Sequence, residues 1–213
     1  MEPTEFFEEE ARRCGYRLVA GLDEAGRGPL AGPVVAAAVL LPRRFRLPGL
    51  NDSKQVGESE RERLAEEILR RATGVGIGLA SPDEIDAMNI LEASRLAMIR
   101  ALQALIPCPE FLLTDAVMLP TVRLPQRAII KGDALCLSIA SASIMAKVTR
   151  DRLMRDYHRR YPHYNFEVHK GYPTPEHLAL LARYGPSAIH RRTFRPVQAV
   201  LGLQGSAAAG SGV

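Results

Sequence analysis

The sequence predicts an α/β protein in which a mixed β-sheet is flanked by helices and followed by a helical C-terminal lobe. Two early apolar segments are joined by a short glycine-rich connection, as in an antiparallel pair, whereas later strand-like segments alternate with helical patterns. From residue 138 onward the helical period dominates. With 213 residues, 46% of them hydrophobic and 24% charged, the chain suits one globular domain.

The first half of the chain alternates between strand and helix signals. Arg17–Asp23 (RLVAGLD) and Pro33–Leu41 (PVVAAAVLL) are apolar runs on either side of a glycine-rich turn, which predicts two strands. Glu58–Ala72 carries an apolar stripe at helical spacing among Glu and Arg, so a helix is predicted there. Val75–Ala80 follows as a short strand. Ser81, with proline next to it, is typical of a helix start.

The second half begins with a predicted helix over about Asn89–Leu105. Phe111–Asp115 (FLLTD) and Arg127–Lys131 (RAIIK) are strand-like. A long helical pattern then runs from Ser138 to about Arg160, and after a loop rich in Pro, Tyr and His a last helix is predicted over Pro175–Tyr184. We expect a single domain over residues 1–204, with a basic helical part from about 140, and a disordered tail over 205–213 because that tail is small and polar.

Basic residues concentrate in the last third of the chain. Residues 140–195 hold 11 Lys and Arg against 4 Asp and Glu, a net charge of +7, together with all five histidines, whereas the whole chain carries +4. This distribution is typical of a surface that binds a polyanion, although arginine-rich helices also occur as solvated faces. The longest apolar run, Pro33–Pro42, is too short to span a membrane and no leader is evident, so a cytoplasmic protein is expected.

The three cysteines do not indicate a metal or disulfide framework. Cys14, Cys108 and Cys136 are odd in number and lack C-x-x-C spacing. Cys136 stands among Leu and Ile residues, so we expect it to be buried. The histidines also lack metal-ligand spacing, and a structural or phosphate-facing role is expected for His169.

Acidic residues follow three of the predicted strands. Asp23 and Glu24 end the first strand, Asp115 closes FLLTD, and Asp133 follows RAIIKG. Acids at strand ends gather at one edge of a sheet, where four like charges would repel one another and some would hold protons unless cations neutralise them. Carboxylate oxygens suit Mg²⁺ or Mn²⁺, and two such ions commonly assist displacement at phosphorus. Neighbouring strand residues face opposite ways, so Asp23 and Glu24 share a site only if the strand bends; a turn or cap is the alternative role for any single Asp.

The glycine-rich GRGPLAG could alternatively be a dinucleotide-binding loop, since it follows a strand. Two features argue against this interpretation. Asp23 and Glu24 would face the pyrophosphate, and Pro29 lacks the backbone N–H that such a loop uses. The spacing also departs from G-x-G-x-x-G.

From about Tyr16 to Gly202 the sequence resembles the bacterial ribonuclease HII family, the type 2 ribonucleases H. Several separate stretches carry the resemblance and are together highly specific: GLDEAGRGPLAGPVVAAAV from Gly21, LNDSK from Leu50, ASIMAKVTRD from Ala142, HKGYPT from His169 and HRRTF from His190. The resemblance implies a ribonuclease H-like fold. It also implies hydrolysis of the RNA strand in RNA–DNA hybrids and incision 5′ to single ribonucleotides in duplex DNA, giving 3′-hydroxyl and 5′-phosphate ends.

The resemblance also assigns roles to individual residues. The catalytic acids, which bind two Mn²⁺ or Mg²⁺ ions, fall on Asp23, Glu24, Asp115 and Asp133. The backbone of Gly26, Arg27 and Gly28 would contact the 2′-hydroxyl, and Tyr172 would pack on the adjacent sugar. This division of labour is chemically reasonable, because a protein tells RNA from DNA by reading a small donor and acceptor at close range.

Polar residues on the long predicted helix are candidates for further substrate contacts. Ser143, Lys147, Arg150 and Asp151 recur at spacings that place them on one face. Lys147 and Lys54 are candidates for phosphate contacts, although each could be an ordinary solvated lysine. Ser143 joins them as a substrate-binding candidate.

The chain departs from the family pattern at two places. Ala116 stands after the third acid, where the family usually has glycine, and Gln55 follows Lys54 where a second lysine is common. We expect the first change to restrict the turn without removing a ligand, and the second to weaken a phosphate contact.

Two rival functions have distinct signatures. A non-catalytic hybrid-binding module would keep the basic lobe and Tyr172 but lose an acid. A junction resolvase would keep paired acids without needing GRG or Tyr172. The resemblance implies a monomer acting on RNA–DNA hybrid or ribonucleotide-containing DNA, with no membrane partner, and Gln198–Leu203 is too weak a motif to establish a sliding-clamp partner.

Overall fold

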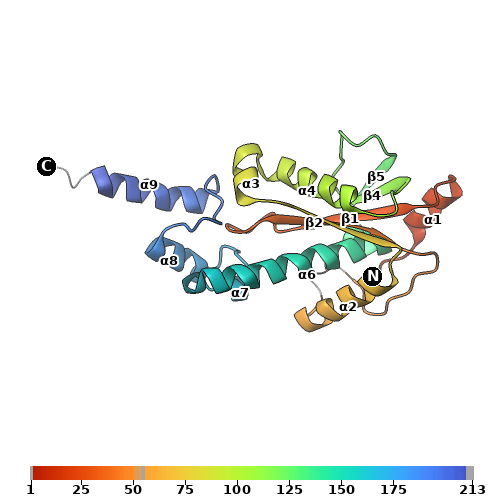
Figure 1. Cartoon of the computed structure of the whole chain (residues 1–213), viewed down its shortest axis with the longest axis horizontal. Coiled ribbons are helices and arrows are strands. Elements are labelled where there is room, and N and C mark those ends of the chain that lie inside the picture. Colours follow the sequence, from red (N-terminus) through yellow and green to blue (C-terminus); the bar gives the residue numbers. More distant parts are fainter. Residues whose placement is uncertain (1, 52, 54–55, 210–213) are drawn as a thin grey trace.

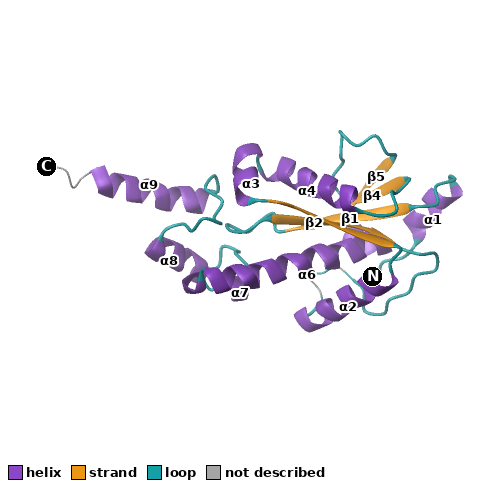
Figure 2. Ribbon diagram, in the orientation of Figure 1, coloured by secondary structure: helices purple, strands orange, loops and turns teal. Residues whose placement is uncertain are grey.

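The computed structural model describes residues 2–51, 53 and 56–209, and it forms one five-stranded mixed sheet with helices on both faces (Figures 1 and 2). The sheet order is β3-β2-β1-β4-β5. The strands are β1 (Val19–Ala25), β2 (Val34–Leu40), β3 (Gly74–Ala80), β4 (Phe111–Asp115) and β5 (Gln126–Ile129). The helices are α1 (Phe6–Arg13), α2 (Glu58–Arg71), α3 (Pro82–Met88), α4 (Ile90–Ala104), α5 (Gly132–Leu135), α6 (Leu137–Arg160), α7 (Phe166–His169), α8 (Pro175–Tyr184) and α9 (Arg195–Ala209), with a 3₁₀ turn at Pro162–Tyr164.

The direction of the strands determines where their ends meet. β1, β2 and β3 form an antiparallel run, whereas β4 pairs parallel to β1 and β5 parallel to β4. Asp115, the last residue of β4, therefore lies at the same edge of the sheet as the end of β1. The α/β class, the antiparallel first pair and the mixed sheet are confirmed.

The sheet is packed on both faces, with α6 and α2 on one side and α4 on the other (Figure 1). One apolar cluster joins β2 to α2 and α6, and it includes Ile144, Met145 and Val148. The long helix approaches β1 closely at Gly21, where a Cβ atom would lie 2.2 Å from the backbone carbonyl carbon of Ser138. Only glycine permits this approach, because a side chain there would force α6 off the sheet.

The N-terminal helix α1 was not predicted, yet it supports the long helix. Glu8 is buried, and its Oε1 accepts a hydrogen bond from the backbone N–H of Ser138 at 2.7 Å and one from the Cys136 thiol at 3.1 Å. A carboxylate at a helix N-terminus satisfies otherwise unpaired amides and is favoured by the helix dipole. Cys136 itself is buried, as predicted.

After α6, which lies along the sheet, the C-terminal lobe continues with α8 and α9 beyond the end of the sheet to which the β1–β2 connection projects (Figure 1). It is helical, as predicted, but α7 and α9 were not expected. α9 continues to Ala209, into the segment 205–213 whose composition predicts disorder. None of the described helices combines the length and the apolar composition that a membrane crossing requires.

Local start signals correspond well to the observed helix ends. Ser81 caps α3 in a capping box with Glu84, whose backbone N–H donates to the serine hydroxyl at 3.2 Å. β5 ends at Ile129, two residues before the predicted Lys131, because Lys131 adopts a left-handed conformation that begins α5. Asp133 therefore lies in the first turn of that short helix.

Candidate active site

Three of the predicted acids converge at one edge of the sheet. Asp23 comes from β1, Asp115 from the end of β4 and Asp133 from α5, and one carboxylate oxygen from each lies within 4.8 Å of the others. Asp115 Oδ1 accepts a hydrogen bond from the backbone N–H of Gly132 at 2.8 Å, which ties β4 to the start of α5. Asp23 is thus brought together with two acids that lie 92 and 110 residues further along the chain.

Glu24 lies beside this acid cluster but outside the group of three. It follows Asp23 within β1, and its carboxyl group is close enough to the cluster for the charge of Asp115 to act on its pKa. Glu24 Oε1 pairs with the Arg27 guanidinium at 3.2 Å. Its second oxygen is buried and has no hydrogen-bond partner among the described residues. A buried carboxylate oxygen without a partner is costly and is suited to accept a cation.

The electrostatics of the cluster also fit a divalent cation. Burial, followed by the negative charges of Glu24 and Asp115, raises the pKa of Asp23 well above its usual value. Burial likewise raises the pKa of Glu24, although Arg27 opposes this effect. A bound metal ion would reverse both shifts, because it is the largest local charge in such a site. With only carboxylate oxygens as donors, the cluster suits a hard divalent cation.

The glycine-rich connection after β1 lies against the predicted sugar-contacting tyrosine. A Cβ atom placed on Gly28 would lie 3.7 Å from Cε1 of Tyr172, whose side chain is 40% exposed. The Tyr172 backbone is fixed by three hydrogen bonds: its N–H donates to His169 O, and its carbonyl accepts from Thr174 N and His177 Nδ1. Gly28 and Tyr172, far apart in sequence, are thus brought together.

Two buried arginines donate hydrogen bonds to the backbone carbonyls of the β1–β2 connection. The sequence did not predict this role. Arg191 is fully buried and donates to the carbonyl oxygens of Gly26 (2.6 Å), Arg27 (2.9 Å) and Gly32 (3.0 Å). Arg150, on α6, donates to the carbonyls of Ala31, Pro33 and Lys170 at 3.0–3.1 Å. Burial lowers the pKa of Arg191 to about 9 and that of Arg150 to about 10.

Gly26 is required by this packing. Its φ of +99° is rarely adopted by other residues, and a Cβ atom there would lie 2.1 Å from Arg150 Nε. The glycines of the GRG motif therefore correctly indicated a place where the backbone packs closely against another part of the protein. No sequence signal marked the arginines as buried, because this residue type is ordinarily exposed.

The candidate phosphate-binding residues differ in their surroundings. Lys147 is partly buried and its Nζ donates to Asp151 Oδ1 at 2.7 Å. Ser143 is buried, and its hydroxyl donates to the hydroxyl of Ser53 at 3.0 Å. Ser143 also lowers the pKa of Asp23, in opposition to the larger effect of burial. It is therefore a neighbour of the acid cluster, whereas Lys54 and Gln55 lie outside the described residues.

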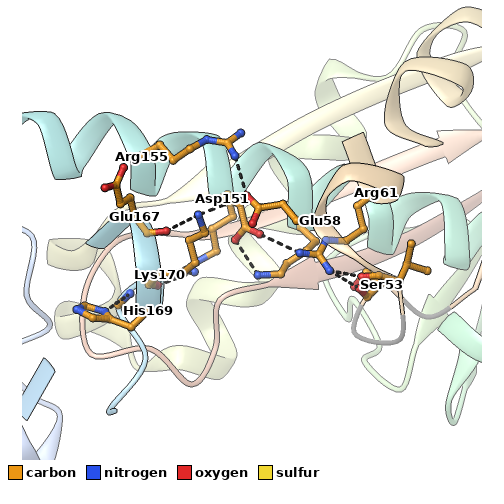
Figure 3. A network of polar contacts seen from close by, with 12 residues as sticks. Ser53, Glu58, Arg61, Asp151, Arg155, Glu167, His169 and Lys170 are labelled. Atoms are coloured by element: carbon orange, nitrogen blue, oxygen red, sulfur yellow. Dashed lines mark hydrogen bonds and ion pairs between the residues drawn. The ribbon is translucent and has the colours of Figure 1, made fainter. Parts of the chain in front are cut away.

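A polar network links Ser53 to α2 and α6 (Figure 3). Arg61 donates to the carbonyls of Ser53 (3.1 Å) and Val56 and lies 3.7 Å from the Asp151 carboxylate. Glu58 pairs with Arg155 at 2.8 Å and Lys170 at 3.6 Å. Several positive charges of the lobe are thus engaged internally, so the free basic surface is smaller than the net charge of residues 140–195 indicates.

Three of the five histidines are buried in the C-terminal part, and Ala116 stands in a bend after β4. His169, His177 and His190 are buried together, and His169 Nε2 lies 2.6 Å from the carbonyl of Tyr164. The structural role expected for His169 matches these contacts. Ala116 adopts a φ of +54°, the conformation that a glycine would adopt more readily, yet Asp115 before it remains in the acid cluster.

This sheet, with acids gathered where β1 and β4 end, defines the chain as a protein of the ribonuclease H-like fold. Solved structures agree. Ribonuclease H2 from Pyrococcus horikoshii OT3 is similar, with a TM-score of 0.74, 29% identity and coverage of 86% of this chain and 97% of that one. RNase HII from Archaeoglobus fulgidus, solved in a complex with PCNA, gives a TM-score of 0.68 at 28% identity and covers 82% and 92%.

The chain belongs to the ribonuclease HII family, whose model matches residues 20–197. Ribonuclease HII of Desulfitobacterium hafniense (strain DSM 10664 / DCB-2) is 57% identical over 189 residues, which cover 89% of this chain and 73% of that protein. Ribonuclease HII of Syntrophotalea carbinolica is 53% identical over 196 residues and covers 92% and 94%. The protein is accordingly an enzyme, a hydrolase with ribonuclease H activity.

Proposed function

We propose that the protein cuts the RNA strand of RNA–DNA hybrids and incises duplex DNA on the 5′ side of single embedded ribonucleotides. The products are 3′-hydroxyl and 5′-phosphate ends. The observation that carries the proposal is the combination of the acid cluster at the end of β1 with the GRG connection and Tyr172 beside it. Such an arrangement couples phosphodiester hydrolysis to recognition of a 2′-hydroxyl, which is the chemistry needed to remove ribonucleotides from DNA.

Asp23, Asp115 and Asp133, with Glu24 beside them, would hold two Mg²⁺ or Mn²⁺ ions. Such ions, when bound, activate a water and stabilise charge on the leaving oxygen. The Mn²⁺ complex of an RNase HIII with the same fold, 18% identical with a TM-score of 0.71, covers 91% of this chain and 72% of that one. The Gly132 amide donates to Asp115 Oδ1, and this hydrogen bond orients the carboxylate within the cluster.

Recognition of the sugar would fall to the glycine-rich connection and Tyr172. The backbone N–H groups of Gly26, Arg27 and Gly28 are the donors for a 2′-oxygen, while Tyr172 packs on the neighbouring sugar. Lys147 and Lys54 would contact phosphates, which position the duplex without reading sequence, and Ser143 would bind substrate next to the acid cluster. Arg27 pairs with Glu24 through its side chain, so its part in recognition is assigned to its backbone.

The test is cleavage of a labelled DNA duplex that contains one ribonucleotide, with Mg²⁺ or Mn²⁺. We expect one cut 5′ to the ribonucleotide, no cut in an all-DNA duplex, and a loss of about 10³-fold or more in kcat for Asp23→Asn. Asp83→Asn, at an exposed position in α3, is the matched control. Binding without cleavage would favour a hybrid-binding module, and cleavage of branched all-DNA substrates would favour a resolvase.

A further inference from the structure

We propose that Arg191 is a positioning residue that sets the ribose selectivity of the active site. Its hydrogen bonds to the carbonyls of Gly26 and Arg27 would orient the two peptide groups between residues 26 and 28 so that the amides of Arg27 and Gly28 face the substrate, while its bond to the Gly32 carbonyl would hold the far end of the connection. The inference rests on the proposed function and extends it, because it assigns selectivity to a residue that cannot touch the nucleic acid. Arg191 is 0% exposed, so its effect must pass through the backbone it holds.

The geometry of the peptide bond carries the argument. In a trans peptide the carbonyl of one residue and the N–H of the next point in opposite directions. Arg191 draws the carbonyls of Gly26 and Arg27 toward the interior, so the N–H groups of Arg27 and Gly28 are turned away from it. Within the described part of the chain, neither of these amides donates a hydrogen bond to the protein. They therefore remain available to a ligand oxygen.

The backbone of Arg191 also takes part in linking the glycine-rich connection to Gly171, the residue before Tyr172. The backbone N–H of Arg191 donates to Leu30 O at 2.8 Å, and the N–H of Leu30 donates to Gly171 O at 2.8 Å. Gly28 and Tyr172, the two sides of the proposed sugar site, are thus held at a fixed separation from one another. A small displacement of either side would misalign the amides with the sugar.

The shape of guanidinium suits this task better than that of an ammonium group. Its planar fork directs Nε, Nη1 and Nη2 at three carbonyl oxygens from different residues at once. A lysine keeps the charge but gathers its donors on a single nitrogen. Arg191→Lys should therefore leave at least one of the carbonyls of Gly26, Arg27 and Gly32 without its partner, and the connection would lose its fixed orientation.

The experiment compares Arg191→Lys with Arg192→Lys, the same change at the exposed neighbouring position. Selectivity is measured as the Ki of a competing all-DNA duplex divided by the KM of the single-ribonucleotide duplex. For Arg191→Lys we expect this ratio to fall about tenfold or more, with a drop of roughly 100-fold in kcat/KM, because small misplacements of a positioned group have effects of this size. For Arg192→Lys we expect the wild-type ratio.

Each outcome has a distinct meaning. If Arg191→Lys folds and loses activity on the ribonucleotide duplex with its selectivity ratio unchanged, Arg191 is only structural and the inference is overturned. Should thermal melting reveal that Arg191→Lys is unfolded, Arg191→Gln is measured in its place, since it removes the buried charge and keeps an amide donor. If the wild-type enzyme does not prefer ribose at all, the proposed function fails instead.

Discussion

The buried histidine pair predicts a loss of stability in mild acid. His190 Nδ1 accepts from the backbone N–H of Ser187 at 2.9 Å, so its Nε2 carries the hydrogen and donates to His177 Nε2 at 3.1 Å. His177 Nδ1 then donates to the Tyr172 carbonyl at 2.9 Å. Every ring nitrogen of the pair is thus matched in the neutral state, and an added proton would bring two N–H groups face to face.

The size of the effect follows from the two pKa values. Burial lowers the pKa of His177 to about 4 and that of His190 to about 3, against about 6.5 in the unfolded chain. At pH 5 the unfolded state binds both protons and the folded state binds neither, which lowers the free energy of unfolding by about 2 kcal/mol for each histidine and about 4 kcal/mol for the pair. At pH 7.5 the contribution is close to zero.

Urea unfolding followed by circular dichroism at pH 7.5 and pH 5 measures this loss. Burial raises the pKa of Asp23 and of Glu24, so these two acids stabilise the folded state as the pH falls, opposite to the effect of the histidines. The wild type is therefore compared with a variant that keeps both acids. We expect His190→Gln to remove about half of the histidine contribution, about 2 kcal/mol. Exposed His163→Gln is the control. An equal loss of stability between the two pH values in His190→Gln and the wild type would refute the reasoning.

Three further variants test the packing around the active site by urea unfolding. Gly21→Ala should lower the free energy of unfolding by about 3 kcal/mol, because the added Cβ would meet the Ser138 backbone. Gly57→Ala is the control and should change it little, since no atom lies within 4 Å of the added Cβ. Equal losses in the two variants would contradict the close approach of α6. Glu8→Ala should lower the free energy of unfolding by about 2 kcal/mol, because the Ser138 amide at the α6 N-terminus loses its acceptor. The control is Glu9→Ala at an exposed position, and an equal effect of the two variants would rule out the cap. Ala116→Gly should stabilise the protein by about 0.5 kcal/mol and leave cleavage intact, since it relieves a positive φ; a loss of stability would count against strain at this turn.

The acid cluster could be predicted because its signals are local. Asp23 and Asp115 each close an apolar strand, and the ends of parallel strands meet at one edge of a sheet. The glycine-rich connection could be predicted for the same reason, because its glycines indicate a tight turn between two strands.

The supports of the site could not be predicted in this way. Arg150 and Arg191 are buried because main-chain carbonyls from distant segments satisfy them, and no periodicity within their own segments encodes that environment. Helix α1 was missed because FFEEEARR is short and mostly charged, while the burial of Glu8 depends on a helix more than a hundred residues away. A side chain whose hydrogen-bond partners lie far away in the sequence cannot be recognised from the local residue pattern.

The order in which the chain is synthesised separates the two halves of the site. The acids are complete once residue 133 has been made, whereas Arg27 O receives its hydrogen bond from Arg191, 164 residues later. Closing so long a loop carries an entropic cost that only a nearly finished chain can offset. A nascent or C-terminally shortened chain would therefore contain all the acids of the cluster before it can fix the backbone that we propose distinguishes ribose from deoxyribose.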